Sequence, residues 1–494
     1  MATKTKVTAP KPVKKTAAKA APAKRAGKAG AHRARVRMYR VGLGDCFLLT
    51  SYEGEKPRHM LIDCGMFAGS RLDPSAAEKT IQSQVVEDIA AATGGHLDVV
   101  AVTHEHMDHV SIFNSAKSVF DSKLTFGQAW FGWVEDPDNK TAQELRRKYE
   151  RLQVSLAAGL AGLQGLAAAD PDGYRDLHLG VAQVAEFTGL GADGKKLAVQ
   201  PRAAMDYVKQ KAGKENLRFG SPGDTWDFGG IKVRVLGPPA NEEQMRIMER
   251  AGASYDRALL FGVDVGVDAN TASAEGAFLG PFATQWREEA SMHEGQARLT
   301  KPHDSGPLAD ILSRYNDAQQ SWRRIDNQAL DSVSTLALQM DKYINNTSLC
   351  LAFEFANGDV MIFPGDAQVG NWSSWFDIKK SEKGFDAEGL LARTILYKVG
   401  HHGSHNATFK PALEKMNHPK LVAMIPTNEK FARESKAWTM PAPKLNEALL
   451  DHTHKRLLRN DQGIGKVADP LKTVEWSGLD ANVEVNPLYI DYFV

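Results

Sequence analysis

The chain has 494 residues, of which 43% are hydrophobic, and a formal net charge of +1 from 61 basic and 60 acidic residues. This length and hydrophobic content exclude a wholly disordered or fibrous protein, and they allow one large domain with insertions or about three ordinary domains. The charge is unevenly distributed, because residues 1–37 carry twelve Lys and Arg and no acid, which leaves −11 on residues 38–494.

The first 36 residues consist mainly of Ala, Lys and Pro, with hardly any large apolar side chain. Such a segment cannot bury enough surface to offset its ordering entropy, so we expect a disordered basic tail over residues 1–36. The tail is either an arm for nucleic acid or another polyanion, or a solvated leader without a partner. The body, residues 37–494, is expected to fold.

Cysteine usage and hydropathy predict the surroundings of the protein. Cys46, Cys64 and Cys350 are too few and too scattered for a disulfide framework, which favours a reducing compartment. The N-terminus lacks the apolar stretch of a secretory signal, and no window of about 20 residues is continuously apolar. We therefore expect a cytoplasmic protein without a membrane segment, whose oligomeric state is left open.

The body begins with the order β-β-β-α-β, and polar residues follow its strand ends. The third strand ends in Asp63, and the fourth runs directly into the segment from His104 to His109. The expected elements are strands at 36–41, 46–50, 60–63 and 97–102 and a helix at 77–92.

The rest of the body combines further strands with two helical regions. Asp366 follows one of these strands, and the pair His401-His402 follows another. Layered α/β folds build their sites at such strand ends. The expected elements are strands at 228–236, 349–355, 360–363, 391–399 and 421–425, with helical insertions at about 138–215 and 240–340.

Six of the fifteen histidines stand in two short segments, at positions 104, 106 and 109 and at positions 401, 402 and 405. Alternate residues of an extended loop point the same way, so His104 and His106 can face one metal ion, while Asp108 and His109 face a second. Imidazole nitrogens with carboxylate oxygens suit zinc, manganese or iron(II). Asp366 is placed to bridge two cations, as carboxylates do in two-metal hydrolases.

Taken in order, these segments resemble the metallo-β-lactamase superfamily. They comprise a strand ending in Asp63, the motif His-x-His-x-Asp-His, a later Gly-Asp366 and a final His-His-Gly-Ser. The segments 42–45, 345–349 and 400–404 resemble in particular the hydrolase domain of ComEC-type competence proteins and its stand-alone bacterial relatives. The resemblance runs from residue 41 to about residue 408.

The resemblance implies an α/β fold of the αββα type, a sandwich of two sheets lying face to face with helices outside. It also implies one or two metal ions at the edge of the sheets and hydrolysis by a metal-bound hydroxide. We expect two divalent ions, zinc or manganese. The helical insertions would then enlarge one hydrolase domain that extends over residues 37–494.

Residue roles follow from the same resemblance. His104 and His106 would bind the first ion, Asp108 and His109 the second, and Asp366 would bridge them. Of the two neighbouring histidines, His402 is favoured as a ligand and His401 as a donor to the developing negative charge of the substrate. Asp108 would also take part in proton transfer, and Asp63 would support the His-rich loop, residues 104–109. Ser404, His405 and Asn406 would contact the substrate.

One departure from the family pattern concerns a further metal-binding histidine, which many members carry between the first motif and the Gly-Asp. Between residues 110 and 365 this chain has only His178, His293 and His303, all in the predicted insertions. We expect Glu135 or Asp136, or a water molecule, to take that place. Fewer nitrogen ligands would favour manganese over zinc.

The resemblance and the basic tail favour a metal-dependent phosphodiesterase or nuclease. The alternative is a small-molecule hydrolase of the same superfamily, acting on a phosphoester, lactone or thioester, because an acidic body with insertions over the site suits a closed pocket. A second alternative is a DNA-binding protein without catalysis.

Overall fold

The computed structural model describes residues 32–169, 171–247, 253–254, 325–378, 385–462 and 482–494. Residues 1–31 of the predicted tail, and most of the predicted insertion at 240–340, lie outside the described residues. The first strand begins at Ala34, earlier than the expected start of the body, because Ala34 and Val36 place apolar side chains in the core.

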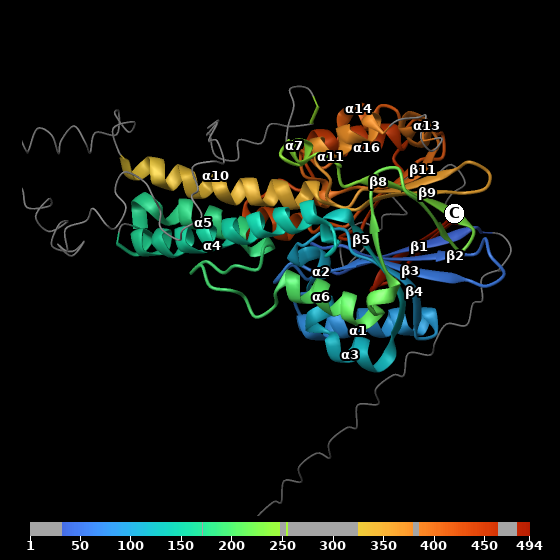
Figure 1. Cartoon of the computed structure of the whole chain (residues 1–494). Coiled ribbons are helices and arrows are strands. Elements are labelled where there is room, and N and C mark those ends of the chain that lie inside the picture. Colours follow the sequence, from blue (N-terminus) through green and yellow to red (C-terminus); the bar gives the residue numbers. More distant parts are fainter. Residues whose placement is uncertain (1–31, 170, 248–252, 255–324, 379–384, 463–481) are drawn as a thin grey trace, which may run out of the picture.

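The described strands form two mixed sheets (Figure 1). The first sheet has the order β14-β15-β1-β2-β3-β4-β5-β6, antiparallel from β14 to β3 and parallel from β3 to β6. Its strands are β1 (Ala34–Tyr39), β2 (Cys46–Ser51), β3 (Arg58–Cys64), β4 (His96–Ala101), β5 (Thr125–Gly132), β6 (Leu217–Gly220), β14 (Val483–Val485) and β15 (Tyr489–Phe493).

The second sheet has the order β13-β12-β11-β10-β9-β8-β7. Its pairs are antiparallel from β7 to β10 and parallel from β10 to β13. Its strands are β7 (Thr225–Phe228), β8 (Ile231–Gly237), β9 (Cys350–Glu354), β10 (Val360–Phe363), β11 (Thr394–Lys398), β12 (Val422–Ile425) and β13 (Leu457–Arg459).

Apolar side chains on both faces of the strands build a layered core. In β4, Val99 and Ala101 pack between the two sheets, whereas Val100 faces the helices outside. The first sheet is covered by α1 (Glu78–Thr93), α2 (Met107–Ser115), α3 (Lys117–Lys123) and α6 (Pro201–Ala212), and the second by α11 (Val369–Ser374), α13 (Ala387–Ala392), α14 (Lys410–Leu413) and α16 (Pro443–His452). The predicted sandwich with outer helices is thus confirmed.

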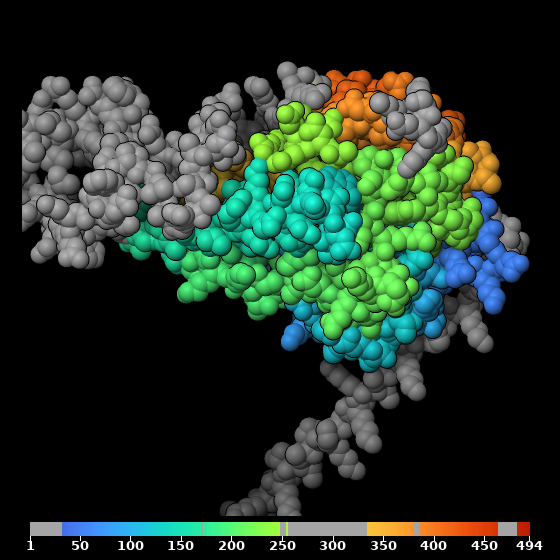
Figure 2. Space-filling view, viewed as in Figure 1, coloured from blue at the N-terminus to red at the C-terminus, as the bar shows by residue number. Residues whose placement is uncertain are grey.

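Three long helices extend from one end of the sandwich: α4 (Lys140–Ala169), α5 (Pro171–Phe187) and α10 (Ile325–Asn346) (Figure 1). They share an apolar core of their own, to which α4 contributes Leu156, Leu160 and Leu163 at i, i+4 and i+7. This spacing places the three side chains on one helical face. The N-terminal part of α4 lies against the segment that contains α7 (Glu242–Met245), as Figure 2 shows. There Lys148 pairs with Glu242 at 2.7 Å.

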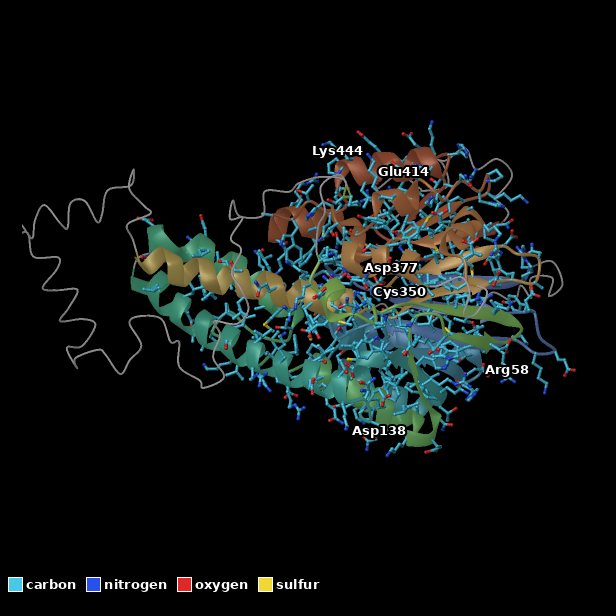
Figure 3. All side chains as sticks on the ribbon, turned by 45° about the horizontal axis from the view of Figure 1, so that its top comes forward. Arg58, Asp138, Cys350, Asp377, Glu414 and Lys444 are labelled. Atoms are coloured by element: carbon cyan, nitrogen blue, oxygen red, sulfur yellow. The ribbon has the colours of Figure 1, made fainter. Side chains whose placement is uncertain are left out.

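Figure 3 orients the outer parts of the molecule. Arg58, at the start of β3, lies at the end of the sandwich opposite the helical extension, and Glu414 and Lys444 lie in the helical layer outside the second sheet. Cys46, Cys64 and Cys350 are buried and carry free thiols.

Candidate metal centre

The predicted site residues follow the ends of four strands. Asp63 lies at the end of β3, the segment from His104 to His109 follows β4, Asp366 follows β10, and His402 follows β11. Because β3 and β4 are parallel, and β10 and β11 are parallel, their carboxyl ends meet at one edge of each sheet. The sandwich therefore gathers residues that are far apart in the sequence, such as Asp108 and His402, which are 294 positions apart.

Four side chains form the centre of this site: Asp108, His109, Asp366 and His402. Each offers one nitrogen or oxygen, and these four atoms all lie within 4.8 Å of one another. His402 Nε2 lies 2.6 Å from Asp108 Oδ2, and His109 Nε2 lies 3.1 Å from Asp366 Oδ2. None of the four side chains is more than 1% exposed. We call this group the DHDH cluster.

The DHDH cluster has the donor set and the unsatisfied atoms expected of a cation site. Asp108 Oδ1, His109 Nε2 and Asp366 Oδ2 are buried without a well-aligned hydrogen bond. Buried polar atoms rarely lack such partners, because desolvation without compensation costs about 1–3 kcal/mol per group. Two imidazoles and two carboxylates match the ligands of zinc and manganese, so the residues present fit a divalent cation.

His104 and His106 form a second pair of nitrogens beside this cluster. His104 Nε2 lies 3.2 Å from His106 Nδ1, and the ring of His104 packs against that of His109 with centroids 4.1 Å apart. The structure therefore places all the predicted histidine ligands of the first motif side by side, with the first pair facing each other as a ligand pair would.

Asp63 and Pro426 hold two histidines in fixed orientations. Asp63 Oδ2 lies 2.8 Å from His109 Nδ1, and the same carboxylate accepts hydrogen bonds from the backbone N–H and hydroxyl of Thr103. His402 Nδ1 lies 2.6 Å from the carbonyl oxygen of Pro426. In both rings the far nitrogen, Nε2, is thereby directed into the DHDH cluster, the arrangement by which outer partners orient metal-binding histidines.

Electrostatics leave the first pair of histidines neutral. Burial, together with the neighbouring imidazole of His109, lowers the pKa of His104 well below its usual value. Burial also lowers the pKa of His106 to about 4, despite the opposing charge of Asp108. Neutral imidazole is the form that binds a metal ion.

The carboxylates of the DHDH cluster are held in the ionised form. Burial is the largest influence on Asp108 and Asp366 and by itself would raise the pKa of both, but neighbouring positive charges, His109 foremost, together outweigh it. His402 adds to this effect at Asp108 and Lys398 adds to it at Asp366, so the pKa of each carboxyl lies below its usual range. Ionised oxygens are the form that a cation requires. Burial lowers the pKa of His109 and His402, but the same carboxylates raise it above its usual value, so each ring would release its Nε2 proton on binding a cation.

Strained backbone marks the same site. Asp63, His401 and His402 adopt φ values of 55°, 45° and 52°, in the left-handed region that non-glycine residues rarely enter. Such a conformation costs about 1–3 kcal/mol and persists where the surrounding structure enforces it, often at functional sites. Here it turns the His401-His402 pair so that only His402 enters the DHDH cluster.

His401 and the predicted substrate contacts lie beside the cluster. The backbone N–H of His401 donates to Asp366 Oδ1 at 2.7 Å, and its ring Nδ1 lies 2.9 Å from Ser404 Oγ. Ser404 Oγ in turn donates to Asn406 Oδ1 at 2.7 Å. His405 is 9% exposed, like His401, and these two are more exposed than the residues of the DHDH cluster.

Glu135 is not brought to the cluster. Its Oε2 is paired with Lys209 at 2.7 Å and with Arg146 and Arg202 at 2.8 Å each. Burial would raise the pKa of Glu135, but these cations lower it far below its usual range. Arg202 also pairs with Glu105, the residue between His104 and His106, so this ion network braces the His-rich loop from outside.

Two buried residues that sequence reasoning did not assign to the site lie against the DHDH cluster. Lys398 Nζ is paired with Asp45 and lies 3.4 Å from Asp366 Oδ1. Burial would lower the pKa of Lys398, but the charges of Asp45 and Asp366 raise it above its usual value. A lysine at the end of the buried strand β11 (Thr394–Lys398) was the signal that could have identified it.

Asp341 is a partly buried residue that sequence reasoning also did not assign to the site, and it lies beside His106. It lies on α10, and its Oδ1 is 4.0 Å from His106 Nε2. Burial raises the pKa of Asp341 to about 7, and the negative charges of Asp108 and Asp366 act in the same direction. An acid within an amphipathic helix has no local signal that would single it out, since only the fold brings it to the His-rich loop.

Gly65 positions the first turn of α2, which carries Asp108 and His109. A Cβ at position 65 would collide with the backbone of both residues, whereas one at the exposed helical Gly162 would have nothing within 4 Å. We expect Gly65→Ala to lower the free energy of unfolding by about 1–3 kcal/mol, and to weaken metal binding by displacing Asp108 and His109. As the matched control, Gly162→Ala should raise the free energy of unfolding by up to about 1 kcal/mol. Denaturant unfolding and metal titration of both variants check this, and equal stabilities would contradict it.

Comparisons with known proteins find a distant match among solved structures. No protein-family model and no curated protein matches the chain. One solved structure that matches is the archaeal metallo-β-lactamase superfamily protein ST1585 from Sulfolobus tokodaii, at 12% sequence identity and a TM-score of 0.18. The match covers 41% of this chain and 55% of that protein, so the chain spans about half the length of its match. Among the described helices, none has the length and apolar character needed to cross a membrane.

Proposed function

We propose that this protein is a hydrolase of the metallo-β-lactamase type that works with two divalent cations, zinc or manganese. The observation that carries the proposal is the DHDH cluster, in which four buried potential ligands converge from three separate segments. The layered fold and the order of the motifs support the same assignment. His104 and His106 would hold one cation, and Asp108, His109 and His402 the other, with Asp366 between them.

Bound cations would lower the pKa of a water molecule toward about 7 and polarise the bond under attack. The residues of the chain would then supply orientation and proton transfer. Asp63 and Pro426 keep the Nε2 atoms of His109 and His402 directed inward. Asp108 and Asp366, held ionised, are the carboxylates able to accept a proton from the attacking water.

His401 is proposed as the group nearest to the substrate. Burial lowers its pKa to about 4, so its ring is neutral at pH 7. Because Ser404 Oγ donates to Asn406, it accepts the proton of His401 Nδ1, which leaves Nε2 of His401 as a proton acceptor. The predicted role of His401 as a donor to developing negative charge would require the amide of Asn406 to be turned over, so that Ser404 donates to Nδ1 instead.

The substrate is proposed to be a phosphodiester, and nucleic acid is the first candidate. The support is the ComEC-type order of the motifs together with the basic tail. A specific observation favours the second candidate, a small-molecule hydrolase: the predicted site residues other than Glu135 are at most 9% exposed, and Phe187 of α5 packs beside His106 with ring centroids 5.6 Å apart. A site enclosed in this way suits a small substrate.

The test is to incubate the full chain with Mn²⁺ or Zn²⁺ and to offer DNA, RNA and bis-p-nitrophenyl phosphate. We expect metal-dependent cleavage of the phosphodiester bond, and cleavage of a nucleic acid would identify a nuclease. Turnover of bis-p-nitrophenyl phosphate alone would favour the small-molecule hydrolase. Absence of turnover with either metal, in a preparation that retains metal, would contradict the proposal.

The role of the tail has a separate test. Residues 1–31 can be deleted without touching β1, which begins at Ala34. If the tail is a polyanion arm, the deletion should weaken DNA binding and flatten its dependence on salt, by about 0.9 in the logarithmic slope for each phosphate that the tail no longer neutralises. The matched control keeps the length but replaces the eight tail lysines by glutamine, and it should behave like the deletion. Binding and salt slope equal to those of the full chain would refute the arm.

A further inference from the structure

Asp341 connects the helical extension to the His-rich loop. It lies near the C-terminal end of α10, where its side chain is 15% exposed. One carboxylate oxygen, Oδ2, accepts a hydrogen bond from Asn345 Nδ2 at 3.2 Å, one helical turn further on. The other, Oδ1, lies 4.0 Å from His106 Nε2. A helix outside the sandwich thus presents a carboxylate to a predicted metal ligand.

The two nitrogens of His106 have different surroundings. Nδ1 faces His104 Nε2 at 3.2 Å. Two nitrogens on one cation, each bound at about 2.0–2.1 Å, stand about 3 Å apart or slightly more, so this pair already has the separation of two ligands. Nε2 of His106 points away from that pair and is buried without a hydrogen-bond partner.

The surroundings decide which nitrogen carries the proton. A neutral imidazole has one N–H, and if Nδ1 faces a cation, the proton must be on Nε2. That N–H is buried, so leaving it unpaired would cost about 1–3 kcal/mol. Asp341 Oδ1 is the carboxylate oxygen facing it, and a shift of about 1 Å would bring the two atoms into hydrogen-bond range.

We propose that Asp341 is a positioning residue, which accepts the Nε2 proton of His106 and thereby fixes Nδ1 as the metal-binding atom. The inference rests on the proposed function, because it needs a cation at the His104–His106 pair. The same arrangement occurs at the DHDH cluster, where Asp63 holds Nδ1 of His109 and directs Nε2 inward. Asp341 would give His106 the support from α10 that Asp63 gives His109 from β3.

The test measures metal affinity of the full chain by competition with a chromophoric chelator, using Zn²⁺ or Mn²⁺ alone. Asp341→Ala should weaken one of two metal sites by about 10–100-fold, the usual effect of losing an outer partner of a metal-binding histidine. Asp341→Asn keeps an acceptor oxygen and should recover part of that loss. Gln339→Ala, a matched truncation on the same helix, should leave the affinity unchanged.

A double-mutant cycle separates positioning from direct ligation. If Asp341 acts through His106, the double variant Asp341→Ala/His106→Ala should bind metal no more weakly than His106→Ala alone. A further loss in the double variant would make Asp341 an independent ligand and overturn the proposal. Unchanged affinity in Asp341→Ala would overturn it as well, provided that thermal unfolding shows the variants to be folded.

These outcomes are distinct from failure of the proposed function. A wild-type chain that binds metal but hydrolyses no phosphodiester would refute the function, while the affinities of the variants would still decide the role of Asp341. A wild-type chain that binds neither cation would refute both.

Discussion

Replacing Asp108 by alanine is expected to abolish metal retention at the DHDH cluster and to reduce kcat by about 10²–10⁴-fold while the protein stays folded. The contribution of a bound cation to transition-state stabilisation is several kcal/mol, and each 1.36 kcal/mol corresponds to a factor of ten in rate. Asp108 lies 2.6 Å from His402 Nε2 and offers an unpaired Oδ1, so its loss removes a ligand and the partner of another. His109→Ala should have the same two effects.

The measurement is metal content by mass spectrometry beside the rate on bis-p-nitrophenyl phosphate, with circular dichroism as the check of folding. Asp227→Ala is the matched control, because Asp227 lies on the edge strand β7 and is exposed. It should retain both metal and activity. Full metal content in both Asp108→Ala and His109→Ala would contradict the assignment of the DHDH cluster.

The second large effect is expected at Lys398, whose replacement by methionine should lower the free energy of unfolding by about 3–5 kcal/mol. Lys398 and Asp45 are each 2% exposed and form a buried ion pair. Removing one partner of such a pair leaves an uncompensated charge in the interior, and this costs about 3–5 kcal/mol. Lys398 Nζ also donates to the carbonyl oxygen of Gly365 at 3.1 Å, a bond that the variant loses.

Denaturant unfolding in the presence of a chelator measures this effect without a contribution from bound metal. Lys232→Met is the matched control: Lys232 is 53% exposed and lies 4.0 Å from Glu354, so its loss should change stability by no more than about 0.5 kcal/mol. Asp45→Asn combined with Lys398→Met should recover part of the loss, because it removes the charge of Asp45, while Asp366 keeps His109 as a partner. If Lys398→Met is as stable as Lys232→Met, the ion pair does not hold this edge of the sandwich together.

The individual strands and helices could be predicted because their signals are local, whereas the layered sandwich was implied by the resemblance of the ordered motifs to a known superfamily. Apolar alternation in strands such as β1 and the helical spacing in α1 follow from the geometry of each element, and both faces of a central strand such as β4 read as apolar. The β9–β10 hairpin is signalled by Asn357-Gly358, whose residues suit its turn. The position of the site was also accessible, because a polar segment directly after a buried strand identifies a strand end.

The sequence by itself determined the chemical identity of the candidate ligands: the histidines and carboxylates of 104–109, Asp366 and the His401-His402 pair. Tertiary structure decided which of them meet. It directs His402 rather than His401 into the DHDH cluster. It also pairs Glu135 with one lysine and two arginines instead of placing it at the cluster. The tertiary structure also brings Lys398 and Asp341 to the site, although neither residue belongs to a recognisable motif. The physical reason is range: side-chain periodicity and turn chemistry act over a few residues, whereas the partner of a buried charge is set by packing between segments hundreds of residues apart.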